Sequence, residues 1–222
     1  MFECTAFAYG KTAFSPRRSI VEKIISLFQR NYDGDRLVRD EVTPGAEWVL
    51  AGEGVATRKW DGTCCRIKDG KLWKRYEVKR GGRPPEGFEP ATEVDPVTGK
   101  QQGWLVVGDG PEDQYHREAY LKAHEICAHG PGVDQIGSPE DGTYELVGPK
   151  VQGNPDGYLS HWLIRHGTAV LESVPRDFDG LRSYLSEADI EGIVWHHPDG
   201  RMVKIKTKDF GLKRRKALEV AS

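Results

Sequence analysis

The sequence predicts an α+β fold in which antiparallel sheet is flanked by a few helices. Its expected strands come mostly as hairpins with few helices between them, whereas a doubly wound sheet would alternate strands and helices. Two strong turn sequences support this prediction, at residues 68–71 and 198–200, each with a glycine directly after an aspartate. Both turns lie between segments rich in apolar residues, so we expect a hairpin at each.

The remaining elements follow from patterns along the chain. An amphipathic helix is expected over 15–30, where Ser15 can cap it and Pro16 suits its first turn. Glycine, proline and charged residues dominate 80–103, which predicts a long surface loop. Two further helices are expected, at 114–129 and 178–185. The expected strands are 54–60, 63–67, 72–78, 103–107, 143–147, 159–164, 169–171, 190–196 and 202–205.

The composition is that of an ordinary globular protein. The chain has 222 residues, of which 37% are hydrophobic and 30% charged, enough for one large domain or two small ones. No apolar run approaches the roughly 20 residues of a transmembrane helix, and residues 1–14 show no secretory signal. The cysteines form no Cys-x-x-Cys pair, so we expect free thiols in a cytoplasmic protein rather than a zinc site. These cysteines are Cys4, Cys64, Cys65 and Cys127.

Charge is unevenly distributed along the chain. The net charge is −2, from 32 Lys and Arg against 34 Asp and Glu, whereas nucleic-acid-binding proteins are usually basic. Residues 201–216, however, hold eight Lys or Arg and one acid, Asp209. A local basic surface can bind phosphates whatever the net charge. Residues 208–216 fit either a segment that follows a phosphate backbone or a solvated run of charge.

The segment from Lys59 to Arg66 carries the main chemical signal. Lys59 ends an expected strand and a turn glycine, Gly62, follows, so its amine would lie at the floor of a pocket. A lysine amine with a pKa of about 10.4 is almost wholly protonated at pH 7. Nearby cations and a metal ion would favour the neutral, nucleophilic form. The Lys-x-Asp-Gly pattern alone is weak, since it should occur by chance in about a few per cent of chains this long.

Other charged residues could complete such a site. Lys204 and Lys206 alternate on one expected strand, so both side chains point to one face and could bind phosphate. Glu145 and Glu191 lie on separate expected strands and could hold a hydrated Mg²⁺. Each of these side chains could instead be an exposed residue of a strand. His161 and His166 fit a hydrogen-bonded core histidine as well as a contact to base or phosphate.

The order of these elements resembles the covalent nucleotidyltransferase superfamily of ATP-dependent DNA ligases, RNA ligases and GTP-dependent capping enzymes. The resemblance implies an antiparallel-sheet nucleotidyltransferase (ATP-grasp-like) domain. It implies that Lys59 is the nucleophile, that Asp61 orients it, and that Lys204 and Lys206 grip the α-phosphate. The implied catalytic residues are Lys59, Asp61, Arg66, Lys204 and Lys206. The implied nucleotide contacts are Lys59, Gly62, Arg66, Glu145, Glu191, Lys204 and Lys206, and the implied metal ligands are Glu145 and Glu191. The implied contacts to the nucleic-acid substrate are Lys74, Arg75 and His161.

Four segments are more closely similar to the small 5′–3′ RNA ligase family known from vertebrates, with bacterial and viral relatives. These segments are 61–65, 153–155, 161–167 and 190–196. The resemblance implies one adenylyltransferase domain over residues 1–222, without an accessory OB-type domain. It also implies ATP and Mg²⁺ or Mn²⁺ as cofactors. Arg58 departs from the pattern, because many ligases have an acid before the nucleophile.

The implied reaction joins RNA ends that carry a 5′-phosphate and a 3′-hydroxyl, through AMP on Lys59. The implied partners are that RNA and an end-healing kinase or phosphatase, with no membrane. Two alternatives stay open. A DNA ligase or a capping guanylyltransferase would keep the fold and change the substrate. A non-catalytic module that binds RNA ends would be expected to lack one or more charged motif residues, yet this sequence has them all.

Overall fold

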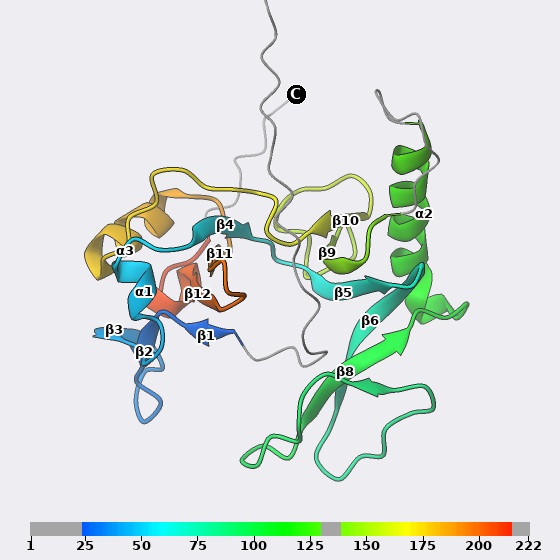
Figure 1. Cartoon of the computed structure of the whole chain (residues 1–222), viewed down its shortest axis with the longest axis horizontal. Coiled ribbons are helices and arrows are strands. Elements are labelled where there is room, and N and C mark those ends of the chain that lie inside the picture. Colours follow the sequence, from blue (N-terminus) through cyan, green and yellow to red (C-terminus); the bar gives the residue numbers. More distant parts are fainter. Residues whose placement is uncertain (1–23, 130–138, 215–222) are drawn as a thin grey trace, which may run out of the picture.

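The computed structural model describes residues 24–129 and 139–214, and these form two main sheets with helices at both ends of the molecule (Figure 1). Most strand pairs are antiparallel, so the expected α+β class with antiparallel sheet is confirmed. No helix within the described ranges is long and apolar enough to cross a membrane.

The first sheet has four strands in the order β1-β12-β11-β4. β4 pairs antiparallel with β11, β11 pairs antiparallel with β12, and only β1 lies parallel to its neighbour in this sheet. A separate two-stranded sheet of β2 and β3 lies beside it (Figure 1). The strands are β1 (Ile25–Ser26), β2 (Phe28–Arg30), β3 (Val38–Val42), β4 (Val55–Lys59), β11 (Gly192–His196) and β12 (Met202–Lys206).

The second sheet has six strands, all paired antiparallel, in the order β10-β9-β5-β6-β8-β7. The turn between β5 and β6 has two residues, Asp69 and Gly70, both with positive φ, as the hairpin prediction requires. The strands are β5 (Thr63–Lys68), β6 (Lys71–Val78), β7 (Glu89–Pro90), β8 (Gln101–Val106), β9 (Gly142–Val147) and β10 (Trp162–Arg165).

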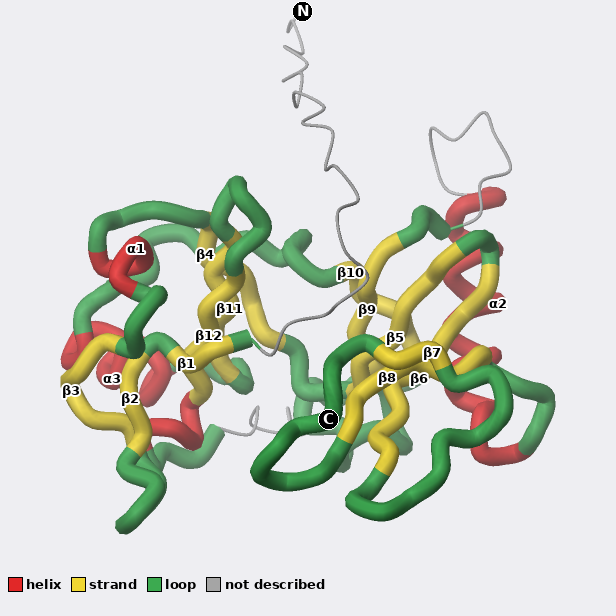
Figure 2. Tube along the Cα trace, turned by 60° about the horizontal axis from the view of Figure 1, so that its bottom comes forward, coloured by secondary structure: helices red, strands yellow, loops and turns green. Residues whose placement is uncertain are grey.

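Helices cover the outer faces of the two sheets, and the sheets lie between them (Figures 1 and 2). α3 (Phe178–Glu187) packs against the first sheet, and its N-cap Asp177 accepts a hydrogen bond from the Gly180 N–H. α2 (Gln114–His129) packs against the second sheet. The shorter helices are α1 (Glu47–Leu50), η1 (Pro111–Asp113) and η2 (Thr207–Phe210).

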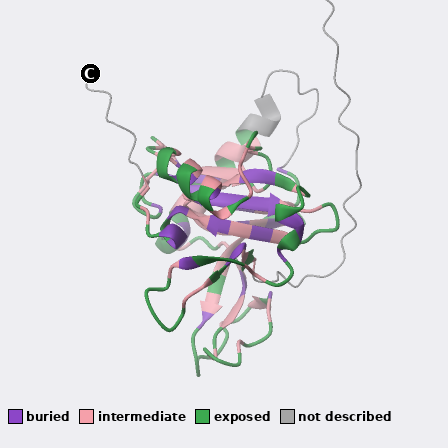
Figure 3. Ribbon diagram, turned by 90° about the vertical axis from the view of Figure 1, so that its left-hand side faces the viewer, coloured by how far each residue is buried: buried purple, intermediate pink, exposed green. Residues whose placement is uncertain are grey.

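Each sheet buries one face against its helix, and buried residues concentrate along the strands (Figure 3). In the first sheet the buried face includes Ile193, Trp195, Val203 and Ile205, which cluster with residues of α3. In the second sheet the buried cluster consists of Cys65, Ile67, Leu72, Ala119, Tyr144, Leu146 and Val151. Side chains alternate along a strand, so the residues between these positions point to the opposite face of each sheet. Those opposite faces are turned toward each other between the two sheets.

The chain passes from the first sheet to the second through Trp60, Asp61 and Gly62. Lys59 is the last residue of β4, and Thr63 is the first residue of β5. A Cβ atom at Gly62 would lie 2.2 Å from the carbonyl oxygen of Leu146, so the close approach to β9 requires a glycine. Lys59 therefore lies where the two sheets meet.

The expected helix over 15–30 is wrong for the described residues 24–30, which form β1 and β2 instead; Ser15 and Pro16 lie outside the described residues. The apolar spacing fits a helix, but the chain pairs with β12, and the Leu27 N–H donates to the Lys204 carbonyl at 2.8 Å. Tertiary pairing has overridden the local pattern.

Smaller differences concern three other segments. The expected strand 169–171 is reduced to a single bridge between Val170 and Thr57. The expected loop 80–103 contains the short strand β7, and β8 begins inside it at Gln101. The expected strand 159–164 begins later, at Trp162.

Candidate active site

Lys59, Glu191 and Lys206 form a linked group on the inner face of the first sheet. Lys59 Nζ lies 2.5 Å from Glu191 Oε2, and Lys206 Nζ lies 2.5 Å from Glu191 Oε1. Glu191 thus holds both ammonium groups with one carboxylate. Burial alone would raise the pKa of Glu191, but Lys59 and Lys206 bring it below its ordinary value.

The register of the first sheet explains this grouping. Gly192 on β11 lies opposite Lys59 of β4 on one side and opposite Lys206 of β12 on the other. A Cβ atom at Gly192 would lie 2.2 Å from the Ile205 carbonyl oxygen, so no larger residue fits between the strands. Directly opposite residues share a face, so the two lysines flank a position that has no side chain.

Lys204 adds a third ammonium group to this face. It precedes Lys206 by two residues on β12 and lies opposite Val194. Burial, and then the charges of Lys206 and Lys59, lower the pKa of Lys204 to about 8. The structure therefore brings together the three lysines that the sequence singles out, and we call Lys59, Lys204 and Lys206 the lysine cluster.

Asp61 lies in the connection between the two sheets, close to this cluster. Burial and the Glu191 charge raise the pKa of Asp61, while Lys59 acts in the opposite direction. Asp61 therefore shares the electrostatic environment of Lys59 and Glu191.

Glu145 lies on the inner face of the second sheet, at 8% exposure. Its Oε1 accepts a hydrogen bond from the Gly62 N–H at 3.1 Å, and its Oε2 lies 2.8 Å from His166 Nε2. Cys64 is directly opposite Glu145 in the β5–β9 pair. Burial, and then Glu145, raise the pKa of Cys64 to about 11. The carboxylate is thus fixed directly beside the turn that follows Lys59.

Arg66 points to the same face of β5 as Cys64, and its guanidinium forms an ion pair with Glu89. Its two terminal nitrogens donate to the two oxygens of Glu89 on β7 at 3.0 and 2.9 Å. The guanidinium also lies over the rings of Trp73 and Trp104, at 4.8 and 5.0 Å from their centroids. The partner of Arg66 therefore comes from the segment expected to be a long loop.

The expected substrate contacts are not brought together. Lys74 and Arg75 are consecutive on β6, so they point to opposite faces of the second sheet. Lys74 Nζ lies 2.6 Å from the buried carboxylate of Asp113, on the helix side, whereas Arg75 lies over the Trp104 ring on the inner side. On geometry, only Arg75 shares the inner face with the rest of the site.

His161 is also held on the helix side. Its Nδ1 lies 2.8 Å from the Glu118 carboxylate of α2, and its ring stacks on Tyr115 with centroids 4.4 Å apart. His161 is only 4% exposed. Of the two possibilities that the sequence left open, its surroundings match a hydrogen-bonded core histidine.

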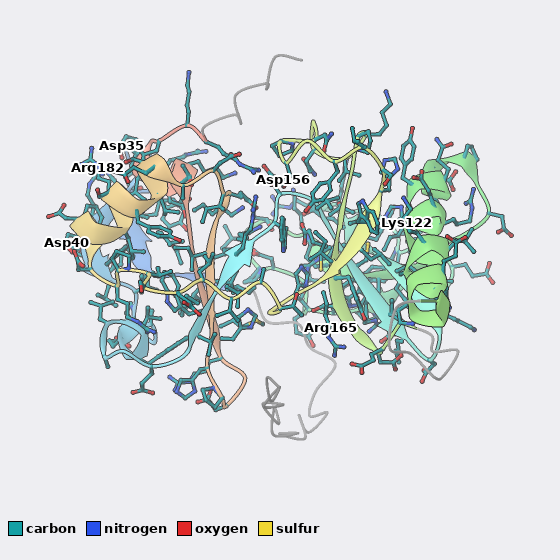
Figure 4. All side chains as sticks on the ribbon, turned by 90° about the horizontal axis from the view of Figure 1, so that it is seen from above. Asp35, Asp40, Lys122, Asp156, Arg165 and Arg182 are labelled. Carbon is teal, nitrogen blue, oxygen red and sulfur yellow. The ribbon has the colours of Figure 1, made fainter. Side chains whose placement is uncertain are left out.

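A network around Asp156 was not expected from the sequence. Asp156 Oδ1 accepts from Arg58 and from Arg214, both at 2.5 Å, and Arg214 also binds Asp189 at 2.8 Å. Arg58 lies over the Trp60 ring at 4.2 Å. Figure 4 shows Asp156 between the two halves of the molecule. The arginine in the unusual position before Lys59 thus has an acidic partner, and of the basic segment 208–216 at least Arg214 serves an internal contact.

One signal in the sequence bears on Asp156, the residue it missed. Asp156 directly follows the Gly-Asn-Pro segment 153–155. That segment does not indicate the partners that Asp156 meets across the fold. His166, a candidate from the sequence, lies beside Glu145, a partner that the sequence did not indicate.

Comparison with known proteins gives one consistent family. The family model "RNA ligase 1" matches residues 135–220, which include Glu145, Glu191, Lys204 and Lys206. RNA ligase 1 of Rattus norvegicus is 28% identical over 224 residues, covering 71% of this chain and 67% of the relative. RNA ligase 1 of Mus musculus is 28% identical over 220 residues with the same coverage, and that of Danio rerio is 39% identical over 80 residues, covering 32% of this chain and 25% of the relative. All of these matches are to RNA ligases, so the chain is similar to RNA ligases.

Proposed function

We propose that this chain is an ATP-dependent RNA ligase that joins a 5′-phosphate to a 3′-hydroxyl through AMP bound covalently to Lys59. The observation that supports it best is the lysine cluster, in which Glu191 holds the candidate nucleophile beside Lys206, with Lys204 on the same face. The RNA ligase relatives support the substrate class. The described fold is compatible with one adenylyltransferase domain of the nucleotidyltransferase (ATP-grasp-like) type.

The residues present fit the two groups that the reaction needs. Three ammonium groups on one face match the charge of a triphosphate. The carboxylate oxygens of Glu145 and Glu191 are the kind of ligand that Mg²⁺ or Mn²⁺ prefers. A bound Mg²⁺ would offset negative charge on the phosphates during transfer.

In the first step, Lys59 Nζ forms a bond to the α-phosphorus of ATP, and the bond from that phosphorus to the bridging oxygen breaks, which releases pyrophosphate. Lys59 must lose a proton to react, and it passes this proton to Glu191 Oε2, which lies 2.5 Å away and accepts its hydrogen bond. Lys204 and Lys206 stabilise the charge that builds on the phosphate oxygens.

The two later steps take place at the RNA ends. An oxygen of the RNA 5′-phosphate attacks the phosphorus of AMP, and the bond to Lys59 Nζ breaks. The 3′-hydroxyl then attacks the 5′-phosphorus, loses its proton, and displaces AMP. Among the expected substrate contacts we assign the RNA end to Arg75, because it lies on the inner face, over the Trp104 ring.

Radioactive ATP and GTP, each labelled at the α-phosphate, test this proposal. Protein incubated with Mg²⁺ and ATP should keep the label after denaturation, and protein incubated with GTP should not. The labelled protein should then join RNA with a 5′-phosphate but leave RNA with a 5′-hydroxyl unjoined. Label from GTP alone would indicate a capping-type enzyme, and absence of label with either nucleotide would contradict the proposal.

A further inference from the structure

Three potential metal ligands meet on the inner face of the second sheet. Cys64 on β5 and Glu145 on β9 lie directly opposite each other, and His166 directly follows β10, the strand beyond β9. The Cys64 sulfur, a Glu145 carboxylate oxygen and a His166 ring nitrogen all lie within 4.8 Å of one another. The group is partly enclosed, because Glu145 is buried and Cys64 half-buried, while the His166 side chain is 31% exposed. An ion could therefore reach it past His166.

The donor types identify the class of metal. Thiolate, imidazole and carboxylate are the three side-chain donors that bind Zn²⁺, and a zinc ion with three protein ligands keeps a fourth position open. Mg²⁺ and Ca²⁺ prefer oxygen ligands throughout, so a thiol in the set disfavours them.

The surroundings already orient two of the three donors. His166 Nε2 points at Glu145 Oε2 at 2.8 Å, so both atoms face the centre of the group. The Gly62 N–H binds the other Glu145 oxygen at 3.1 Å and fixes the carboxylate from behind. Such outer hydrogen bonds orient the ligands in metal sites.

We propose that Cys64, Glu145 and His166 form a Zn²⁺-binding site. Binding releases the thiol proton of Cys64 to solvent. The ring proton of His166 moves from Nε2 to Nδ1 through solvent, so that the ion takes the place of the hydrogen bond between His166 Nε2 and Glu145. The Cys-x-x-Cys spacing that is typical of many zinc sites is missing, because these ligands come from β5, from β9 and from the end of β10. The sheet, not the local sequence, brings them together.

The site bears on the ligase reaction through Glu145. A zinc ion there would occupy the carboxylate that the proposed function gives to the nucleotide or to Mg²⁺. Inhibition of Lys59 labelling by zinc is the expected consequence, and this consequence rests on the proposed function. Zinc binding itself does not, and it can be measured without ATP or RNA.

Cobalt is the probe for a direct test, because Co²⁺ takes zinc sites and absorbs in the near ultraviolet when a thiolate binds it. The full chain, freed of metal with a chelator, is titrated with Co²⁺ and then with Zn²⁺. We expect one equivalent of cobalt with the thiolate band, and its displacement by Zn²⁺, because thiolate, imidazole and carboxylate are the ligands that Zn²⁺ prefers.

Two neighbouring cysteines give a matched pair of variants. Cys64→Ala should lose the thiolate band, whereas Cys65→Ala should keep it, because Cys65 is fully buried on the helix side. His166→Gln should bind cobalt at least about tenfold more weakly. Circular dichroism checks that each variant is folded. If Cys64→Ala does not fold, His166→Gln still tests the site. No thiolate band in the wild type, or an unchanged band in folded Cys64→Ala, would overturn the proposal. Either result would leave the ATP-labelling experiment intact.

Discussion

At the scale of single residues, Lys204 is held in an environment that disfavours its charge. Burial, Lys206 and Lys59 together lower the pKa of Lys204 to about 8. An unfolded chain keeps the ordinary lysine value of about 10.4. Between these values the unfolded state binds more protons than the folded state, so the free energy of unfolding rises with pH across this window. Below pH 8 Lys204 is charged in both the folded and the unfolded state, so the whole cost of burying its charge lowers the free energy of unfolding.

Replacing Lys204 should therefore stabilise the protein near neutral pH. We expect Lys204→Met to raise the free energy of unfolding by about 1–2 kcal/mol at pH 7, after allowance for solvent screening. The gain should disappear above pH about 10.5, where the unfolded state also loses the proton. Urea denaturation at both pH values measures it. The exposed Lys79→Met is the control, with a change under about 0.5 kcal/mol. A gain that does not depend on pH would contradict this explanation.

The sequence identified the members of the lysine cluster but not their connections. Lys59, Lys204 and Lys206 were predicted from the strand-end position, the turn glycine and the alternation along β12. Glu191 was expected to be a metal or nucleotide ligand, and the structure shows its carboxylate bound to two of the lysines. That pairing depends on the strand register, which places Gly192 between Lys59 and Lys206. A local sequence pattern cannot predict the register of three strands that are far apart in the chain.

At the scale of elements, the connection from β4 to β5 depends on the missing side chain at Gly62. We expect Gly62→Ala to lower the free energy of unfolding by about 1–3 kcal/mol, because the new Cβ would lie 2.2 Å from the Leu146 carbonyl oxygen. Gly108→Ala is the matched control, since its new Cβ would lie 3.7 Å from the nearest atom, an ordinary contact. Urea denaturation compares the two variants, and equal losses of stability would show that the contact with β9 is not the cause.

Elements with a strong local signal were predicted well, and those defined by distant partners were not. The hairpin of β5 and β6 matches because Asp69 and Gly70 favour the required turn by themselves. The segment 24–30 has the apolar spacing of a helix, yet it forms strands because β12 presents a free edge for β1. Glu89 on β7 could not be foreseen as the partner of Arg66, since it lies in a segment whose composition is typical of loops.

At the scale of the whole molecule, Asp156 ties together segments that are far apart in the chain. It follows the second-sheet strand β9, and its partners are Arg58 on β4 and Arg214 after η2. The side chain of Asp156 is only 5% exposed, and these two guanidinium groups are its ion-pair partners. The network thus connects the first sheet, the loop before β10 and the C-terminal end of the described chain.

Removing this charge should destabilise the protein strongly. We expect Asp156→Ala to lower the free energy of unfolding by about 3 kcal/mol, because the partly buried Arg58 loses its acidic partner and Arg214 keeps only Asp189. The control is Asp199→Ala, at an ion pair with Arg201 in which both side chains are about half exposed, with an expected loss under about 1 kcal/mol. Chemical denaturation of both variants gives the comparison. Similar small losses would mean that the Asp156 network does not hold the segments together.

The central claim, that Lys59 is the nucleophile, is tested most directly by locating AMP on the protein. The full chain is incubated with ATP and Mg²⁺, digested, and its peptides are analysed by mass spectrometry. We predict AMP on Lys59 in the wild type and in the exposed control Lys79→Ala, and none on Lys59→Ala. The lowered pKa of Lys204 makes it the competing nucleophile in the same cluster. AMP on Lys204, or AMP retained by Lys59→Ala, would contradict the account.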